Sequence, residues 1–196
     1  CNILYPDGFE DISNREETVK ALAALKQKYP DLRKAVVKMN DGFSGEGNSF
    51  FSYKDLSVND TLEQAISDQL EQRIKPVLAE MPAHVFLQKM YEMHGVVEEF
   101  IEGDYKTSPS VQCRINPDFT YDVLSTHDQV LDEETGQVFQ GAFFPAIPDY
   151  AVGLGYAGRL ISKALQSKGC IGRYSVDFLS VQRNGEWLNY AIEINL

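Results

Sequence analysis

The hydrophobic positions of the chain follow helical spacing in some segments and strand spacing in others, which predicts a mixed α+β protein. Apolar residues recur every three or four positions in several segments, as on the buried face of a helix. Between these segments lie short runs rich in Val, Ile, Phe and Tyr, which favour strands. We therefore expect helices at 14–29, 61–75, 83–93 and 149–167, and strands at 34–40, 50–53, 95–102, 110–145 (interrupted by turns), 172–182 and 187–196.

Local signals also place the ends of the helices. The segment Ser13–Glu16 is a capping-box pattern, so the first helix should begin near Asn14, and Pro30 follows its expected end. The second helix should begin near Thr61 and end or kink at Pro76, because proline cannot donate a backbone hydrogen bond. In the last helix, the apolar spacing predicts a buried stripe of Val152, Tyr156, Leu160, Ala164 and Leu165.

Size and charge narrow the class of protein. A chain of 196 residues can form one core or two small lobes that share a cleft. The net charge of −11 argues against nonspecific binding to nucleic acid or anionic membranes, and no apolar run approaches the ~18–20 residues that span a bilayer. Any nucleotide phosphates would therefore have to be met by local cations or a metal. The cysteines form no C-x-x-C pair, which fits a cytoplasmic protein without a disulfide framework or structural zinc: Cys1, Cys113 and Cys170.

Both ends of the chain have the character of internal sequence. The first residue is Cys1, with no signal-peptide pattern, and 187–196 predicts a strand with no turn or cap behind it. We expect a longer protein whose missing segments contribute to substrate selection.

The first candidate for chemistry is a lysine strand followed by a glycine-rich loop. Lys38 precedes Asp41–Asn48, whose three glycines let the backbone approach a ligand closely. The loop has neither a P-loop nor a G-x-G-x-x-G pattern. The lysine would reach phosphate oxygens and the loop would cover them. Taken alone, the segment is more typical of a flexible hairpin tip beside a surface lysine.

The second candidate is the apolar strand Val96–Gly103, which contains the adjacent residues Glu98 and Glu99. Such a strand can offer backbone groups to an adenine, while a carboxylate accepts hydrogen bonds from the adenine amino group or the ribose hydroxyls. Glutamates on the outer face of a half-buried strand are the commoner explanation for this pattern.

The third candidate is Glu193 with Asn195, which strand alternation places on one face of the last strand. With Asp177 on the partner strand, they would supply the oxygen ligands that Mg²⁺ prefers. A two-residue turn at Asn184-Gly185 would leave Asp177 and Glu193 on opposite faces, so their meeting requires an odd-length connection or a bulge. The alternative is a solvated polar face on an ordinary hairpin.

In this order the three segments resemble the ATP-grasp superfamily. The motifs K-M-N-D-G-F-S-G-E-G-N, G-V-V-E-E-F-I-E-G and G-R-Y-S-V-D-F…Y-A-I-E-I-N look closest to its carboxylate–amine (peptide) ligase branch. That branch contains the pheganomycin peptide ligase and the ATP-grasp region of IQ-motif-containing protein H. The likeness runs from about residue 6 to the last residue. It implies two α/β lobes, 14–100 for the nucleotide lid and 101–196 for metal binding and catalysis, which clasp the nucleotide between antiparallel β-hairpins. It also implies a preceding domain outside this chain.

The resemblance implies a role for each motif. Lys38 would contact the α- and β-phosphates of ATP, and Arg114 would neutralise the transferring phosphoryl group or the acyl phosphate. One or two Mg²⁺ ions, or Mn²⁺, would bind Asp177, Glu193 and Asn195. Glu98 would line the adenine site by its side chain, and its neighbours mainly by their backbone. The complete nucleotide-binding set would be Lys38, Gly42, Ser44, Gly45, Glu46, Gly47, Asn48, Glu98, Glu99, Phe100 and Ile101.

The implied reaction is ATP-dependent ligation of a small-molecule or peptide carboxylate to an amine. The γ-phosphoryl group would pass to the carboxylate, and the amine would attack the resulting acyl phosphate. Two other functions stay open on the same fold, a nucleotide-binding regulatory module and a small-molecule kinase. The chain departs from D-alanine ligases at Ser175, where those enzymes carry an arginine two residues before the metal aspartate. Arg173 lies two positions further back on the same strand face, and we do not assume that it substitutes.

Overall fold

The computed structural model describes residues 3–42, 47–133, 136 and 138–196, and these form two compact units. The N-terminal unit comprises Asp7–Ile101 together with Gly136 and Val138, and the C-terminal unit comprises 3–6, 102–133 and 139–196. Residues 3–6 join the C-terminal unit because Leu4 forms a β-bridge with Tyr190, and its carbonyl accepts the Ala191 N–H at 2.8 Å. The division predicted from the sequence, between residues 100 and 101, did not assign this N-terminal segment to the second lobe.

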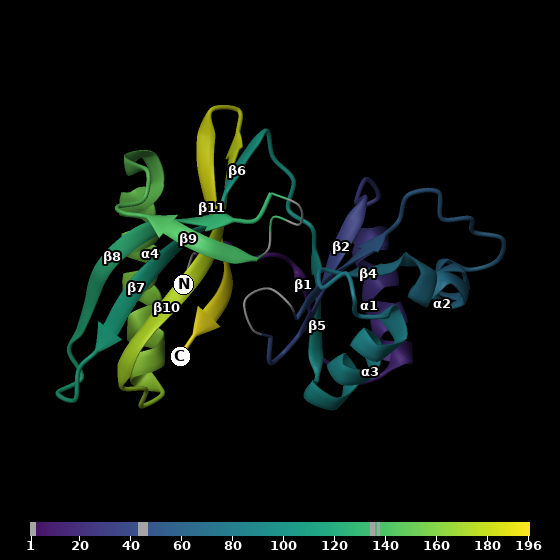
Figure 1. The fold of residues 1–196 in the computed structure, drawn as a ribbon, viewed down its shortest axis with the longest axis horizontal. Coiled ribbons are helices and arrows are strands. Elements are labelled where there is room, and N and C mark those ends of the chain that lie inside the picture. The colour runs from purple at the N-terminus through teal and green to yellow at the C-terminus, as the bar shows by residue number, and fades with distance from the viewer. Residues whose placement is uncertain (1–2, 43–46, 134–135, 137) are drawn as a thin grey trace. The chain divides into compact units, whose positions relative to one another are not determined.

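The N-terminal unit is an antiparallel five-stranded sheet with helices on one face (Figure 1). Side chains alternate across its strands, so one face is buried and the other is open. The strands, in sheet order, are β1 (Gly8–Ile12), β5 (Gly95–Glu99), β2 (Lys34–Met39), β3 (Asn48–Ser52) and β4 (Ile74–Pro76). The helices are α1 (Arg15–Lys28), α2 (Leu62–Arg73) and α3 (Ala83–Met93).

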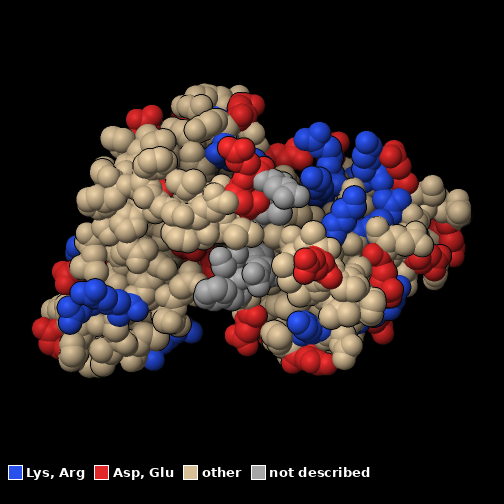
Figure 2. Space-filling view, in the orientation of Figure 1, with Lys and Arg blue, Asp and Glu red and all other residues tan. Residues whose placement is uncertain are grey.

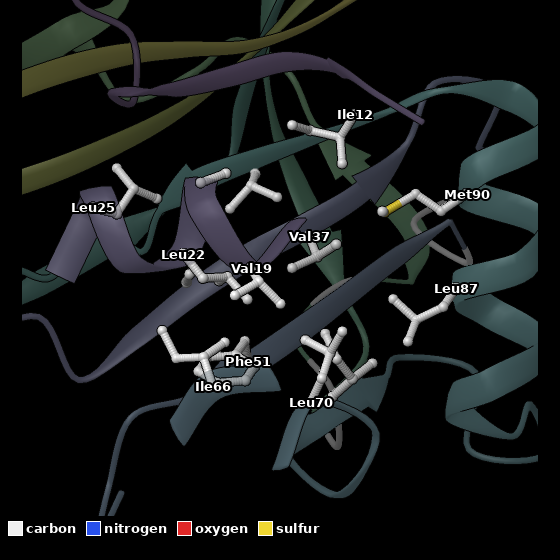
Figure 3. Packing of buried hydrophobic residues seen from close by; sticks show 14 of the residues in the cluster. Ile12, Val19, Leu22, Leu25, Val37, Phe51, Ile66, Leu70, Leu87 and Met90 are labelled. Atoms are coloured by element: carbon white, nitrogen blue, oxygen red, sulfur yellow. The ribbon is translucent and has the colours of Figure 1, made fainter. Parts of the chain in front are cut away.

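One hydrophobic core joins the helices of this unit to the buried face of its sheet (Figure 3). Val37 and Phe51 project from neighbouring strands and are fully buried. Leu22 of α1, Leu70 of α2 and Met90 of α3 close over them. Removing this much apolar surface from water stabilises the unit and fixes which strand positions remain on the open face.

The C-terminal unit is a six-stranded antiparallel sheet covered on one face by α4 (Pro148–Ser167) (Figure 1). Its core contains the inward-facing residues of β7 and β10 and the buried side of α4. The opposite sheet face carries mainly polar side chains. The main path runs β11 (Glu186–Asn195), β10 (Gly172–Arg183), β7 (Pro109–Ile115), β8 (Tyr121–Leu131) and β9 (Phe139–Phe143), and β6 (Tyr105–Thr107) also pairs with β10.

The ends of two helices differ slightly from the sequence prediction. Asn14 caps α1 by accepting the Glu17 N–H at 2.9 Å, and the Glu17 carboxylate returns to Ser13. The capping pair is therefore displaced by one residue from the predicted Ser13–Glu16 box. Helix α2 ends at Arg73 because Ile74 pairs with Phe51 as part of edge strand β4. An edge strand tolerates a proline such as Pro76, which here lies in β4 and is not the helix terminator.

The predicted buried stripe of α4 was wrong for three of its five residues, although Leu165 packs against the core. Val152 and Tyr156 are 83% and 64% exposed, and Ala164 is also exposed. The helix approaches the sheet at Gly158, where an added Cβ would lie 3.1 Å from the Cys113 sulfur. Small and polar residues thus belong to the contact face, which comprises Tyr150, Leu154, Gly158, Ile161 and Ser162. Like the other described helices, α4 lacks the combination of length and apolar character needed to cross a membrane.

Candidate functional site

Lys38 and Glu98 form an ion pair on the open face of the N-terminal sheet. Lys38 Nζ lies 2.7 Å from Glu98 Oε2, and the side chains are only 19% and 15% exposed. In the register of β2 and β5, Val36 lies opposite Glu98 and Lys38 lies opposite Val96, so the ion pair is diagonal. Two residues predicted from separate motifs therefore meet. An arriving phosphate would compete with Glu98 for the ammonium group, which would release the carboxylate to accept hydrogen bonds.

Aromatic and basic side chains extend the same face. Phe50 lies opposite Val36 on one side and Lys75 on the other. The Phe50 and Phe100 rings meet edge to face with centroids 5.8 Å apart, and Lys34 Nζ lies 5.6 Å from the Phe100 ring centre. Figure 2 shows basic side chains gathered over this part of the unit. An apolar surface beside cations suits a planar base next to phosphates. Strand alternation in the sequence contained this signal for Phe50 and Lys34, which the motif analysis missed, whereas Lys75 was assigned to a predicted helix and gave no such signal.

Glu99 has a structural role in the N-terminal unit. Its carboxylate accepts the Asp7 N–H at 3.1 Å, and its own N–H donates to the Asp7 carbonyl at 2.8 Å. Asp7 in turn accepts hydrogen bonds from Lys28 and from the Tyr29 hydroxyl. The hydrogen bond from Lys28 is the main reason why the pKa of Asp7 lies below its ordinary value.

The second candidate strand is shorter than predicted. Strand β5 ends at Glu99, where the sequence predicted a strand to Glu102. Beyond that point Phe100 donates its N–H to the Lys34 carbonyl at 3.4 Å, and Ile101 is buried. The backbone of this exit segment remains the predicted adenine edge.

The glycine-rich loop is described only at its ends. Ser44, Gly45 and Glu46 lie outside the described residues. Gly42 and Gly47 face each other so closely that a Cβ on Gly47 would lie 2.6 Å from the Gly42 Cα. Asn48 lies opposite Lys38 at the start of β3. Backbone packing at the neck of the hairpin therefore accounts for two of the glycines that we assigned to ligand approach.

A β-bulge brings the predicted metal ligands of the C-terminal unit together. The β10–β11 hairpin has a two-residue turn, in which Asn184 and Gly185 both have positive φ. Register is regular from this turn up to the pair Phe178 and Ala191, and one extra residue on β11 then places Asp177 opposite Glu193. The bulge is thus the feature on which the convergence of the two acids depends.

Asn195 completes this group of oxygen-bearing side chains. Its Nδ2 donates to Asp177 Oδ2 at 3.2 Å, and Ser175 lies opposite it on β10. Two carboxylates with an amide oxygen suit Mg²⁺, which prefers oxygen ligands and retains waters or phosphate oxygens. The described residues contain no cluster of three or more His, Cys, Asp and Glu side chains. A metal held by Asp177, Glu193 and Asn195 would therefore need ligands from solvent or a nucleotide.

Arg114 does not lie beside the predicted metal ligands along the sheet. It lies opposite Arg173 of β10, whereas Ser110 lies opposite Asp177. Four residues of strand separate these positions on β7, which is about 13 Å of backbone. Cross-strand partners point to the same face, so both arginines share the open face with Asp177.

Comparison with known proteins adds one relative in sequence. No family model matches the chain. The chain is similar to L-propargylglycine--L-glutamate ligase of Streptantibioticus cattleyicolor, with 34% identity over 116 residues. The match covers 59% of this chain and 23% of the relative, so it spans less than a quarter of that protein's length.

Solved structures resemble the chain over nearly its whole length. The biotin carboxylase domain of the 2-oxoglutarate carboxylase of Hydrogenobacter thermophilus, solved with MgADP, ADP and bicarbonate, gives a TM-score of 0.66 at 16% identity, covering 98% of this chain and 36% of that one. An ADP complex of N5-carboxyaminoimidazole ribonucleotide synthetase gives 0.62 at 14%, covering 98% and 40%. The D-alanyl-alanine synthetase A of Vibrio cholerae gives 0.55 at 13%, covering 99% and 51%. At such low identity the likeness establishes the fold, and it confirms the ATP-grasp fold expected from the motifs.

Proposed function

We propose that this chain, which has the ATP-grasp fold, is the nucleotide- and metal-binding part of an ATP-dependent carboxylate–amine ligase. The enzyme would form a C–N bond and release ADP and phosphate. The observation that carries the proposal is the convergence of Asp177, Glu193 and Asn195 through a bulge that an ordinary two-residue hairpin would not need. Bulges commonly redirect side chains next to active sites.

The open face of the N-terminal unit supports nucleotide binding. Lys38 would exchange Glu98 for the phosphates of ATP, and Glu98 would then accept hydrogen bonds from the adenine amino group or ribose. Phe50 and Phe100 offer apolar surface for the base. The backbone at Ile101 would present the adenine edge.

The C-terminal unit would supply the chemistry of phosphoryl transfer. The γ-phosphorus–oxygen bond of ATP breaks as a carboxylate oxygen bonds to phosphorus, which gives ADP and an acyl phosphate. The amine nitrogen then attacks the carbonyl carbon, phosphate leaves and the nitrogen loses a proton. A bound Mg²⁺ would supply charge neutralisation, and Asp177, Glu193 and Asn195 would hold it. Such reactions need mainly positioning and electrostatic stabilisation from the protein.

Two of the similar proteins are named for the substrates that they join. One joins L-propargylglycine to L-glutamate, and a structural neighbour is a D-alanyl-alanine synthetase. We therefore propose an amino-acid or peptide carboxylate and an amine as substrates. Because the match spans only 23% of the sequence relative, the proposal is limited to this class and does not carry over that relative's particular amino acids.

An assay for ADP tests this function directly. The full-length protein should form ADP only with a suitable amino acid or peptide, and hydroxylamine should trap the acyl phosphate as a hydroxamate. Asp177→Asn and Glu193→Gln should each reduce turnover by at least a hundredfold, whereas Glu186→Gln, at the other end of the same strand, should not. Formation of AMP and pyrophosphate would overturn the mechanism. ADP with a stable phosphorylated product would indicate a kinase, and no turnover over a broad panel would indicate a regulatory module.

A further inference from the structure

Two arginines lie directly opposite each other on the open face of the C-terminal sheet. Arg114 of β7 and Arg173 of β10 are cross-strand partners, and both are exposed. Side chains of directly opposed residues on a sheet are close neighbours, and like charges in such a pair repel. The β7–β10 pairing therefore places two positive charges together in a chain whose net charge is −11.

Neither arginine forms an ion pair with a carboxylate of the described residues. No carboxylate oxygen of the described residues lies within 4 Å of either guanidinium group. Asp122 lies opposite Arg114 on β8, where its Oδ2 accepts a hydrogen bond from Asn116 at 3.1 Å, so one acid faces a pair of cations. Two adjacent guanidinium groups still form an electrostatic site for an anion, since each presents a planar fork of donors.

Position on the sheet indicates which anion fits. Ser175 and Gln112 lie between the arginine pair and the Asp177–Ser110 pair, and they are themselves cross-strand partners. The arginines thus lie about 13 Å of backbone from the level of Asp177 and Glu193, and Asn195, opposite Ser175, lies between the two levels. A span of this size suits an amino acid or a short peptide. The pair therefore lies at the opposite end of this stretch of sheet from the two acids, where it is placed for the end of a substrate that points away from Asp177 and Glu193.

We infer that Arg114 and Arg173 together bind a carboxylate group of the substrate that is not the one activated by ATP. The identity of this anion as a ligase substrate rests on the proposed function, whereas the anion site itself does not. The substrate class is then a dicarboxylic amino acid or a peptide with a second free carboxylate. Bidentate guanidinium contacts would fix the substrate's direction along the sheet and so position its other carboxylate.

A binding experiment tests the site without requiring catalysis. The full-length, ¹⁵N-labelled protein is titrated with glutarate while the arginine Nε–Hε signals are followed by NMR. Glutarate should shift two arginine signals, and Arg114→Gln and Arg173→Gln should each remove one signal and weaken binding about tenfold or more. Lys163→Gln makes the same charge change on exposed α4 and should leave the affinity unchanged. Binding that is equal in all four proteins would overturn the site.

Steady-state kinetics then tests the assignment to a substrate carboxylate. Arg173→Gln should raise KM for a dicarboxylic substrate at least tenfold and leave KM for ATP unchanged. A fall in kcat for mono- and dicarboxylic substrates alike, with KM unchanged, would assign the arginines to the phosphoryl group and overturn the inference. If the protein lacks ligase activity but binds glutarate through both arginines, the proposed function is refuted and the anion site is confirmed. Thermal unfolding serves as the folding control, because removing one of two like charges should keep or raise the midpoint.

Discussion

Asp177 lies directly opposite Glu193 in the β10–β11 hairpin, although the turn that joins the strands contains only Asn184 and Gly185. With unbroken register, Asp177 would face Ile192, and the two acids would lie on opposite faces. The bulge therefore places two carboxylates side by side, and like charges directly opposite each other repel. An arrangement that opposes stability and suits a ligand is typical of functional sites.

This relationship predicts how stability responds to metal. Asp177→Asn should raise the unfolding midpoint in metal-free solution, because it relieves repulsion with Glu193, and should abolish stabilisation by Mg²⁺ with ADP. Differential scanning fluorimetry with and without MgADP measures both effects, and Glu186→Gln on the same strand is the matched control. If MgADP raises the unfolding midpoint of Asp177→Asn as much as that of the unmodified protein, Asp177 is not a ligand of the metal.

The hairpin shows how far the sequence could predict this site. The two strands and the turn follow from alternation and the Asn-Gly signal, and the structure confirms them. The same alternation singles out the candidate acids. The sequence also showed that Asp177 and Glu193 can meet only through an odd-length connection or a bulge. It could not choose between a bulged hairpin and an ordinary one, because a bulge is decided by packing against neighbouring strands.

Helix α4 shows the opposite case, in which the element was predicted and its orientation was not. Its apolar residues Val152 and Tyr156 are exposed, while Gly158 and Ser162 are buried. The Ser162 hydroxyl donates to the Gly158 carbonyl at 2.8 Å and lies 2.6 Å from the Tyr174 hydroxyl. Hydrophobicity alone ranks such residues as outward-facing, and only their tertiary partners reverse that ranking.

Two glycines of α4 should respond oppositely to alanine. Gly155→Ala should stabilise the protein by about 0.5–1 kcal/mol, because alanine favours helix and its Cβ would meet nothing within 4 Å. Gly158→Ala should destabilise it, because the same gain is opposed by contacts at 3.1 Å with Cys113 and Val111. Urea unfolding measures both, and stabilisation of similar size at the two positions would contradict the close packing at Gly158.

Asp7 should make the stability of the N-terminal unit depend on acid pH. Its folded-state pKa is lowered, chiefly by the hydrogen bond from Lys28, so the unfolded chain binds the proton more readily. Stability from Asp7 is therefore fully present above its ordinary pKa of 3.8 and is lost as pH falls through the lower folded-state pKa. Thermal midpoints measured from pH 6 to pH 2 should fall less steeply in Asp7→Asn, whereas exposed Asp31→Asn should behave like the unmodified protein. Parallel curves for Asp7→Asn and the unmodified protein would refute the assignment.

The Lys38–Glu98 pair should couple ATP binding to stability. Lys38→Ala should weaken ATP binding about tenfold or more, because it removes charge-assisted contacts worth about 1.5–3 kcal/mol. The substitution also leaves Glu98, only 15% exposed, without its cation, which should cost about 1–3 kcal/mol of folding stability. Calorimetric titration and chemical unfolding measure the two effects separately, with exposed Lys89→Ala of α3 as the control.

A second substitution separates binding from folding. Adding Glu98→Gln to Lys38→Ala should restore most of the lost stability, because a neutral amide tolerates the half-buried position better than an unpaired carboxylate. The same double variant should still bind ATP at least tenfold more weakly than the unmodified protein, since both groups assigned to the nucleotide are then altered. If the double variant recovers ATP affinity along with stability, Lys38 acts through the fold alone and does not contact the phosphates. If Lys38→Ala loses stability but binds ATP normally, the lysine lies outside the nucleotide site, and the open face of β2 must be assigned another role.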